Sequence, residues 1–180
     1  MMAREIGKKG IVLPKESAWE ASLVEGISVY PVESLSEAVD FFSGKKPISP
    51  LQKEESPYLL SSPRKHALDF SEIKGQLKLK RAVEVAVAGG HNLLMLGPPG
   101  SGKSMVAKRI PSILPPPTLD EYLEILNIFS IGGISSSLHG NGMGRPIRSP
   151  HHTISDVGLL GGGTKPGPGE ISLAHNGILF

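Results

Sequence analysis

The stretch GPPGSGKS, from Gly97 to Ser104, constrains the fold of this chain more than any other part of its sequence. It matches the pattern G-x-x-x-x-G-K-[ST], in which glycines let the backbone curl so that successive N–H groups point at phosphate oxygens. Lys103 places a positive charge against the β- and γ-phosphates, and the hydroxyl of Ser104 can ligate Mg²⁺. The pattern therefore predicts a phosphate loop that binds a nucleoside triphosphate with Mg²⁺.

The segments on either side of this loop support the prediction. "NLLMLG", residues 92–97, is a continuous apolar run, too short for a helix and typical of a central parallel strand. A helix is expected after Gly102, with its N-terminus facing the same anion, and "LPPPT" ends it. No G-x-G-x-x-G follows the strand, so a dinucleotide site is excluded. The residues expected at the nucleotide are Gly97, Pro98, Pro99, Gly100, Ser101, Gly102, Lys103, Ser104 and Met105, with Lys103 stabilising phosphate charge and Ser104 ligating Mg²⁺.

Residues 1–46 alternate strand and helix signals in the order β-α-β-α. "GIVLP" and "ISVYPV" are the strand signals, and a capping box follows each of them, at Ser17 to Glu20 and at Ser34 to Glu37. The segment is too small to bury much apolar area alone, so it is expected to be part of a larger domain or a lobe docked on the rest.

Residues 47–66 are rich in proline and serine and show no periodicity, which is typical of a linker. A loop wrapped around the following domain is the alternative. From residue 67 onward the pattern predicts a helix with one apolar face that ends at Gly89 and Gly90. A third capping box, Thr118 to Glu121, precedes another helix, and the glycine-rich remainder is expected to be loop-like.

Composition excludes several classes of protein. The chain has no cysteine, which removes disulfides, thiol catalysis and cysteine-ligated zinc. Its net charge of +2 does not by itself imply a polyanionic partner. No apolar run approaches the ~20 residues that span a bilayer, and the charged N-terminus lacks the apolar core of a signal peptide. We expect a cytoplasmic protein with no membrane partner.

Two stretches carry a more specific signal than the phosphate loop. "RSPHHTISD" and "PGEISLAHNG", together with the loop and its flanks, make the chain from about Asp69 to Phe180 resemble the magnesium-chelatase-like AAA+ ATPases of the ComM/YifB type. The resemblance implies an α/β P-loop three-layer sandwich over 67–180. It also implies that residues 1–46 are the end of a Lon-protease-like domain, joined by the linker 47–66.

The resemblance also implies how the chain ends. In this family the strand that begins "ILF" at residue 178 continues into a Walker B Asp-Glu pair, which holds Mg²⁺ and polarises the attacking water. The chain is therefore expected to be a fragment cut at both ends that binds ATP and hydrolyses it negligibly. The intact family member is expected to form a hexameric ring that acts on DNA, for example in branch migration during recombination.

Two arginines are candidates for DNA contact. The resemblance places Arg145 and Arg148 in a region where such ring ATPases carry inserted hairpins, and the alternative is that they cap neighbouring elements. Adjacent His151 and His152 would point to opposite faces of an extended segment, so a zinc site is not favoured. His175 and Asn176 are expected to be turn or cap residues.

The segment "DFSEIKGQ", residues 69–76, lies where related AAA+ proteins line the adenine pocket. Ile73 and Gly75 are the candidate contacts, and an ordinary helix entry is the alternative. Lys78, Lys80 and Arg81 are expected to form a solvated helix face.

Two other functions remain open. A true magnesium-chelatase subunit would use the same core to insert Mg²⁺ into a porphyrin, although such subunits lack the Lon-like domain. The other is a truncated product that binds nucleotide weakly or does not fold.

Overall fold

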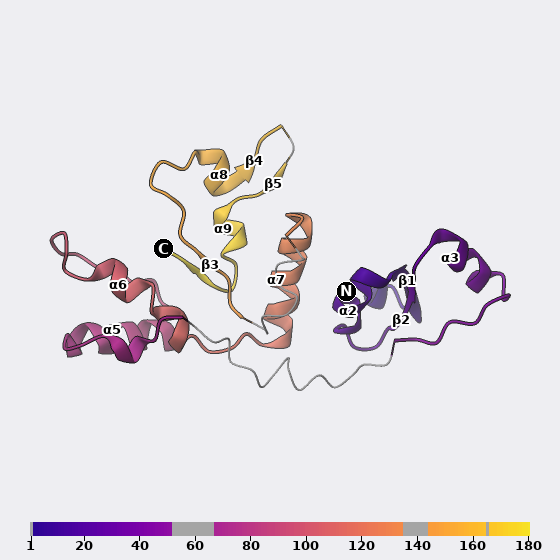
Figure 1. The fold of residues 1–180 in the computed structure, drawn as a ribbon, viewed down its shortest axis with the longest axis horizontal. Helices are drawn as coiled ribbons and strands as arrows, with labels where there is room; N and C mark the ends of the chain where they lie inside the picture. Colours follow the sequence, from indigo (N-terminus) through magenta and orange to yellow (C-terminus); the bar gives the residue numbers. More distant parts are fainter. Residues whose placement is uncertain (1, 52–66, 135–143, 165) are drawn as a thin grey trace. The chain divides into compact units, whose positions relative to one another are not determined.

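The computed structural model describes residues 2–51, 67–134, 144–164 and 166–180. The chain divides into two compact units, residues 1–56 and 57–180 (Figure 1). Helices and strands mix in both units, which confirms the predicted α/β class. Most of the predicted linker lies outside the described residues.

The first unit is built on two parallel strands joined by a helix. Strands β1 (Gly10–Pro14) and β2 (Ser28–Val32) pair in register along their full length, and α2 (Lys15–Ser22) connects them. Ala18 of α2 and Val29 of β2 are both only 2% exposed, so the core lies between the helix and the strand pair. The other helices of this unit are α1 (Met2–Glu5) and α3 (Leu35–Phe42).

The two predicted capping boxes of this unit have different outcomes. Ser34 caps α3 by accepting from the Glu37 N–H, whereas the Glu37 carboxylate accepts from the N–H of Glu33. The box predicted at Ser17 is wrong, because α2 begins directly after Pro14 and leaves Ser17 inside its first turn. Pro14, the last residue of β1, is therefore the N-cap residue of α2 and makes no side-chain capping hydrogen bond.

Helix α3 packs against β2 through Phe41. Its Phe41 ring lies 5.1 Å from the ring of Tyr30 in β2, measured between centroids. Leu35, Val39 and Phe42, which share another face at helical spacing, are 57–82% exposed. The apolar periodicity therefore predicts the helix correctly but does not identify the face that it buries.

The second unit contains two clusters of buried apolar side chains. The first joins Phe70 and Ile73 to Val83 and Val106, and the second joins Ile125 and Phe129 to Leu173. Within residues 67–134 the elements are η1 (Phe70–Glu72), α5 (Leu77–Ala88), α6 (Lys103–Ala107), η2 (Ile110–Ile113) and α7 (Leu119–Ile131). From residue 144 onward they are β3 (Ile147–Arg148), α8 (Asp156–Leu160), β4 (Gly161–Gly162), β5 (Gly167–Pro168), α9 (Glu170–Leu173) and β6 (Ile178–Leu179).

The strand predicted at residues 92–97 is not formed. The segment has no regular secondary structure, with Met95 packed on the first cluster, whereas Leu94 and Leu96 are 80% and 87% exposed. A strand needs a neighbour to pair its N–H and C=O groups, and no strand among the described residues pairs with this segment. The described strands pair two by two, β1 with β2, β3 with β6 and β4 with β5, so they do not build a three-layer sandwich.

The helix predicted after Gly102 is shorter than expected. Helix α6 ends at Ala107, and residues Ile110–Ile113 form a separate 3₁₀ turn that contains Pro111. Proline lacks an N–H and its ring clashes with the preceding helical turn, so a continuous α-helix cannot pass through this position.

The capping box before α7 is confirmed in full. The Thr118 hydroxyl accepts from the Glu121 N–H at 3.3 Å, and the Glu121 carboxylate accepts from the Thr118 N–H at 2.7 Å. Strand β6 pairs in parallel with β3, placing Ile178 opposite Ile147. In the parts of the chain that the structure describes, no helix has the length and apolar character to cross a membrane.

Candidate functional site

The phosphate loop is curled on itself. Gly100 and Gly102 have φ angles of +78° and +89°, which other residues rarely adopt, so these two glycines allow the curl. A Cβ atom on Gly97 would lie 2.9 Å from Oγ of Ser101, which shows how closely the two ends of the loop approach. Helix α6 starts at Lys103, directly after the loop.

The side chain of Lys103 lies inside this curl. Its Nζ donates to the carbonyl oxygens of Gly97 and Pro98, each at 2.8 Å, and to Oγ of Ser101 at 3.1 Å. The ammonium is thus positioned by oxygens of the loop itself. The Ser104 side chain is exposed next to it. A cation and an exposed hydroxyl at adjacent positions suit a phosphate with its Mg²⁺.

The segment 69–76 is fastened to the end of α6 and the turn that follows. Arg109 forms an ion pair with Glu72 through two nitrogens, with Nη2 at 2.7 Å and Nε at 3.0 Å from Oε2. The Phe70 N–H donates to Oγ of Ser112 at 2.9 Å. Sequence periodicity cannot predict the contacts of Arg109 with Glu72 and of Phe70 with Ser112, because the partners lie 37 and 42 residues apart.

Two predictions about this segment need correction. The Ile73 side chain is 2% exposed and belongs to the first apolar cluster, so it is not free to contact a base. Lys80 does not belong to a solvated face, because it is half-buried and its Nζ donates to the Ile73 carbonyl at 2.8 Å. Lys78 and Arg81 are exposed, as expected, and Arg81 pairs with Glu84.

Arg145 is tied to three segments of the second unit. Its guanidinium donates to the Pro115 carbonyl at 2.8 Å, to both carboxylate oxygens of Glu121 at 3.2 and 2.9 Å, and to the Asn176 carbonyl at 2.8 Å. Together with the Thr118 N–H, which is the larger cause, this guanidinium lowers the pKa of Glu121. These contacts correspond to the alternative given above, in which Arg145 caps neighbouring elements. Contact of Arg145 with DNA stays a prediction.

Arg148 pairs with Glu170 and so joins β3 to α9. Both carboxylate oxygens of Glu170 accept from the Arg148 guanidinium, through Nε and Nη2. The side chains are 33% and 19% exposed. Hydrogen bonding from Arg148 is the main cause that lowers the pKa of Glu170, and the same contact raises the pKa of Arg148.

This pair makes the stability of the second unit depend on pH. Because the folded chain holds the pKa of Glu170 below its ordinary value of 4.5, the carboxylate stabilises the fold above that value. The contribution is lost as the pH falls through the lowered pKa. We expect thermal melts of Glu170→Gln to change less than those of the parent over this acid range. Parallel acid profiles for the two proteins would contradict the assignment.

The histidines contact polar neighbours and each other. The rings of His151 and His152 lie 4.1 Å apart, and Nδ1 of His151 lies 2.8 Å from Oγ1 of Thr153. Among the described residues, no group of three His, Cys, Asp or Glu side chains could hold a metal ion. His175 Nε2 lies 2.9 Å from Glu124, and Asn176, at a φ of +54°, bonds Glu124 and the Glu121 carbonyl.

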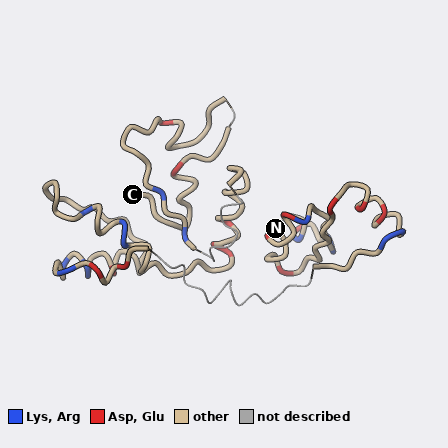
Figure 2. The backbone as a smooth tube through the Cα atoms, in the orientation of Figure 1, with Lys and Arg blue, Asp and Glu red and all other residues tan. Residues whose placement is uncertain are grey.

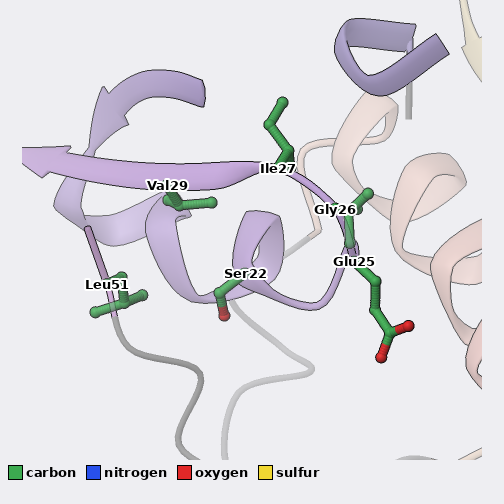
Figure 3. Close-up of a pocket in the computed structure, with 7 residues that line it drawn as sticks. Ser22, Glu25, Gly26, Ile27, Val29 and Leu51 are labelled. Carbon is green, nitrogen blue, oxygen red and sulfur yellow. The ribbon is translucent and has the colours of Figure 1, made fainter. Parts of the chain in front are cut away.

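Charge and cavities elsewhere in the described residues point to no second site. Lys and Arg occur in both units, interspersed with Asp and Glu (Figure 2). A pocket of about 270 Å³ in the first unit, between the end of α2, β2 and Leu51, offers one carboxylate, Glu25, and one hydroxyl, Ser22 (Figure 3). Its remaining lining is Val24, Gly26, Ile27 and Val29. Such a lining brings together no catalytic pair of side chains.

Comparison with known proteins gives a consistent set of relatives. The family described as "Magnesium chelatase, subunit ChlI" matches residues 69–180. Competence protein ComM of Haemophilus influenzae is 42% identical over 182 residues, which cover 100% of this chain and 35% of the relative. Protein YifB of Escherichia coli is 41% identical over 97% of this chain and 33% of its own length. The chain thus spans about a third of the length of these curated relatives.

Proposed function

Because this chain belongs to the magnesium chelatase, subunit ChlI family, and within it to the ComM/YifB type, we propose that residues 97–105 bind ATP with Mg²⁺. The position of Lys103 carries the proposal. Its ammonium is held at the centre of the loop by two carbonyls and a hydroxyl, where it can transfer to phosphate oxygens without a large movement. Mg²⁺, bound with the nucleotide, would supply positive charge on the phosphates, and Ser104 would be its protein ligand.

For the whole protein, we propose ATP hydrolysis that drives a ring-shaped assembly. Catalysis of phosphoryl transfer is mostly positioning and charge stabilisation, and Lys103 supplies part of both. An α/β P-loop fold is the one that we propose for the ATPase part of the whole protein, to which residues 67–180 would belong. The N-terminal unit would then be part of a Lon-protease-like domain.

A role on DNA is the function of the whole protein that we favour. The relative named ComM matches 100% of this chain, and so residues 1–68, and the relative named YifB matches 97% of it, whereas the family model begins at residue 69. This pattern favours the ComM/YifB type over a subunit that inserts Mg²⁺ into a porphyrin, the alternative that the description of the family suggests. Porphyrin-dependent ATP hydrolysis by the whole protein would support that alternative.

Arg148 is the better placed of the two arginines for DNA contact. It is 33% exposed, and no described residue bonds its Nη1. We expect Arg148→Ala in the whole protein to reduce the salt dependence of DNA binding by about one unit of slope in log Kd against log salt concentration. Fluorescence anisotropy over a salt series measures this slope. An unchanged slope would show that Arg148 pairs with Glu170 but does not contact DNA phosphates.

Direct binding tests the central proposal. Isothermal titration of the chain with Mg·ATP is expected to give saturable binding at one site per chain. Titration with Mg·tripolyphosphate separates recognition of the phosphates from recognition of the nucleoside. Absence of binding for both ligands would contradict the proposal.

A further inference from the structure

Asn176 and Gly177 form an Asn-Gly pair in the turn that leads into β6. Such a pair deamidates readily, because glycine has no side chain to shield its backbone nitrogen. In this reaction the Gly177 nitrogen attacks Cγ of Asn176 and forms an N–Cγ bond. The side-chain nitrogen leaves as ammonia and takes the proton of the Gly177 N–H. Water then opens the resulting succinimide to aspartate or isoaspartate, so the reaction needs only the chain and water.

Helix α7 holds the side-chain amide of Asn176. Its Nδ2 donates to the Glu121 carbonyl at 3.3 Å and to Oε2 of Glu124 at 2.7 Å. An amide nitrogen carries two N–H donors, and both acceptors belong to the same helix. The nitrogen that would leave as ammonia is therefore bound at two places, and the amide group can move only when both bonds break.

The backbone nitrogen that would attack is held separately. The Gly177 N–H donates to the Ala174 carbonyl at 2.9 Å, and the next N–H, of Ile178, donates to the Pro146 carbonyl at 2.9 Å. A Cβ atom on Gly177 would overlap the Pro146 carbonyl oxygen, which shows how closely the backbone is packed here. The two atoms that must form a bond are thus each fixed by contacts of their own.

Deamidation would replace the donor in these contacts by an acceptor. The carboxylate of the product would face the Glu121 carbonyl and the Glu124 carboxylate, and neither of these groups can donate to it. Isoaspartate would also add one methylene group to the backbone directly before β6. The pairing of Ile178 with Ile147 would be weakened in both products.

We propose that Asn176 is a deamidation site that the fold keeps closed through Glu121 and Glu124, and that becomes reactive when the turn 174–177 separates from α7. The inference does not depend on nucleotide binding. Because the product lacks the donor that closes the turn, a chain that reacts in the open form does not return to the original closed form. The site makes local opening of the turn irreversible.

Four variants test the assignment. Glu124→Ala removes one acceptor of the Asn176 amide, and Glu124→Gln keeps a side-chain oxygen that can accept from it. Asp120→Ala removes an exposed carboxylate from the first turn of the same helix and is the matched control. Asn176→Asp reproduces one of the two products.

Mass spectrometry of the peptide that contains residue 176 measures the reaction in the full chain, incubated at one pH and temperature with and without urea. We expect Asn176 to deamidate at least about tenfold more slowly in the folded chain than in urea. Glu124→Ala should raise the rate in the folded chain about three- to tenfold, as the loss of one hydrogen bond predicts. Glu124→Gln and Asp120→Ala should stay close to the parent. Hydrogen exchange at the Ile178 N–H should be faster in Asn176→Asp.

The comparison of the folded parent with the parent in urea decides the inference without any variant. Equal rates in the two conditions would show that the fold does not protect Asn176, and the inference would be wrong. It would also be wrong if Glu124→Ala reacted no faster than the parent, or no faster than Asp120→Ala or Glu124→Gln. Unchanged exchange at Ile178 in Asn176→Asp would contradict it as well, because the amide would then not be needed to close the turn.

Discussion

Lys103→Ala is expected to reduce by half or more the stabilisation that Mg·ATP gives to the folded chain. A ligand at 100 times its Kd adds about 2.7 kcal/mol to the free energy of unfolding of a protein that it binds. Charge-assisted hydrogen bonds of the kind that Lys103 offers contribute about 1.5–3 kcal/mol, so their loss weakens binding roughly 10- to 100-fold. At that concentration the variant should keep about 0.4–1.4 kcal/mol of this stabilisation, so thermal melts with and without Mg·ATP should show a shift in the variant of about half the parent's or less.

Lys108→Ala is the matched control for this experiment. Lys108 follows the last residue of α6 and is exposed, so its removal takes away the same charge from the same helix without touching the loop. The three acceptors of Lys103 are loop oxygens, and water can replace the ammonium at those that are exposed, so the melt without nucleotide should change little. If Mg·ATP shifts the melting temperature of Lys103→Ala as much as that of the parent, Lys103 does not contribute to nucleotide binding.

Gly177→Ala is expected to separate β3 from β6. A Cβ atom at this position would overlap the carbonyl oxygen of Pro146 and lie 2.8 Å from two atoms of its ring. The obstacle includes backbone, which cannot rotate away as a flexible side chain does. Overpacking of this kind costs about 1–3 kcal/mol or more. The N–H groups of Ile178 and Phe180, which bond Pro146 and Arg148, should exchange with solvent faster in the variant.

Gly167→Ala provides the comparison within the same unit. No atom of the described residues lies within 4 Å of a Cβ at this glycine, and its φ is not positive. The substitution should be neutral or stabilising by up to about 1 kcal/mol, since it restricts the unfolded chain. Similar exchange rates of the Ile178 N–H in both variants would show that the close approach of residue 177 to Pro146 does not determine the stability of the β3–β6 pair.

Local signals in the sequence were sufficient for several elements of the fold. Thr118 and Glu121 lie three residues apart, and their mutual hydrogen bonds follow from that spacing alone. The strand signals at residues 10–14 and 27–32 likewise matched β1 and β2. The spacing of glycines and a lysine from Gly97 to Ser104 predicts a phosphate loop because that chemistry requires these residues at fixed positions, and nucleotide binding there stays a prediction.

Long-range contacts could not be predicted in this way. The apolar run 92–97 has the composition of a strand, yet a strand also needs a partner, which its own residues do not specify. The ion pairs of Arg145 with Glu121 and of Arg148 with Glu170 join residues 24 and 22 positions apart.

Glu121 makes two structural elements thermodynamically interdependent. One carboxylate accepts the hydrogen bond that starts α7 and also binds the guanidinium of Arg145 just before β3. Fraying of the first turn of α7 would therefore release Arg145, and loss of Arg145 would weaken that turn. The two elements should open as one cooperative unit, and the free energies of substitutions at Thr118 and Arg145 should not be additive.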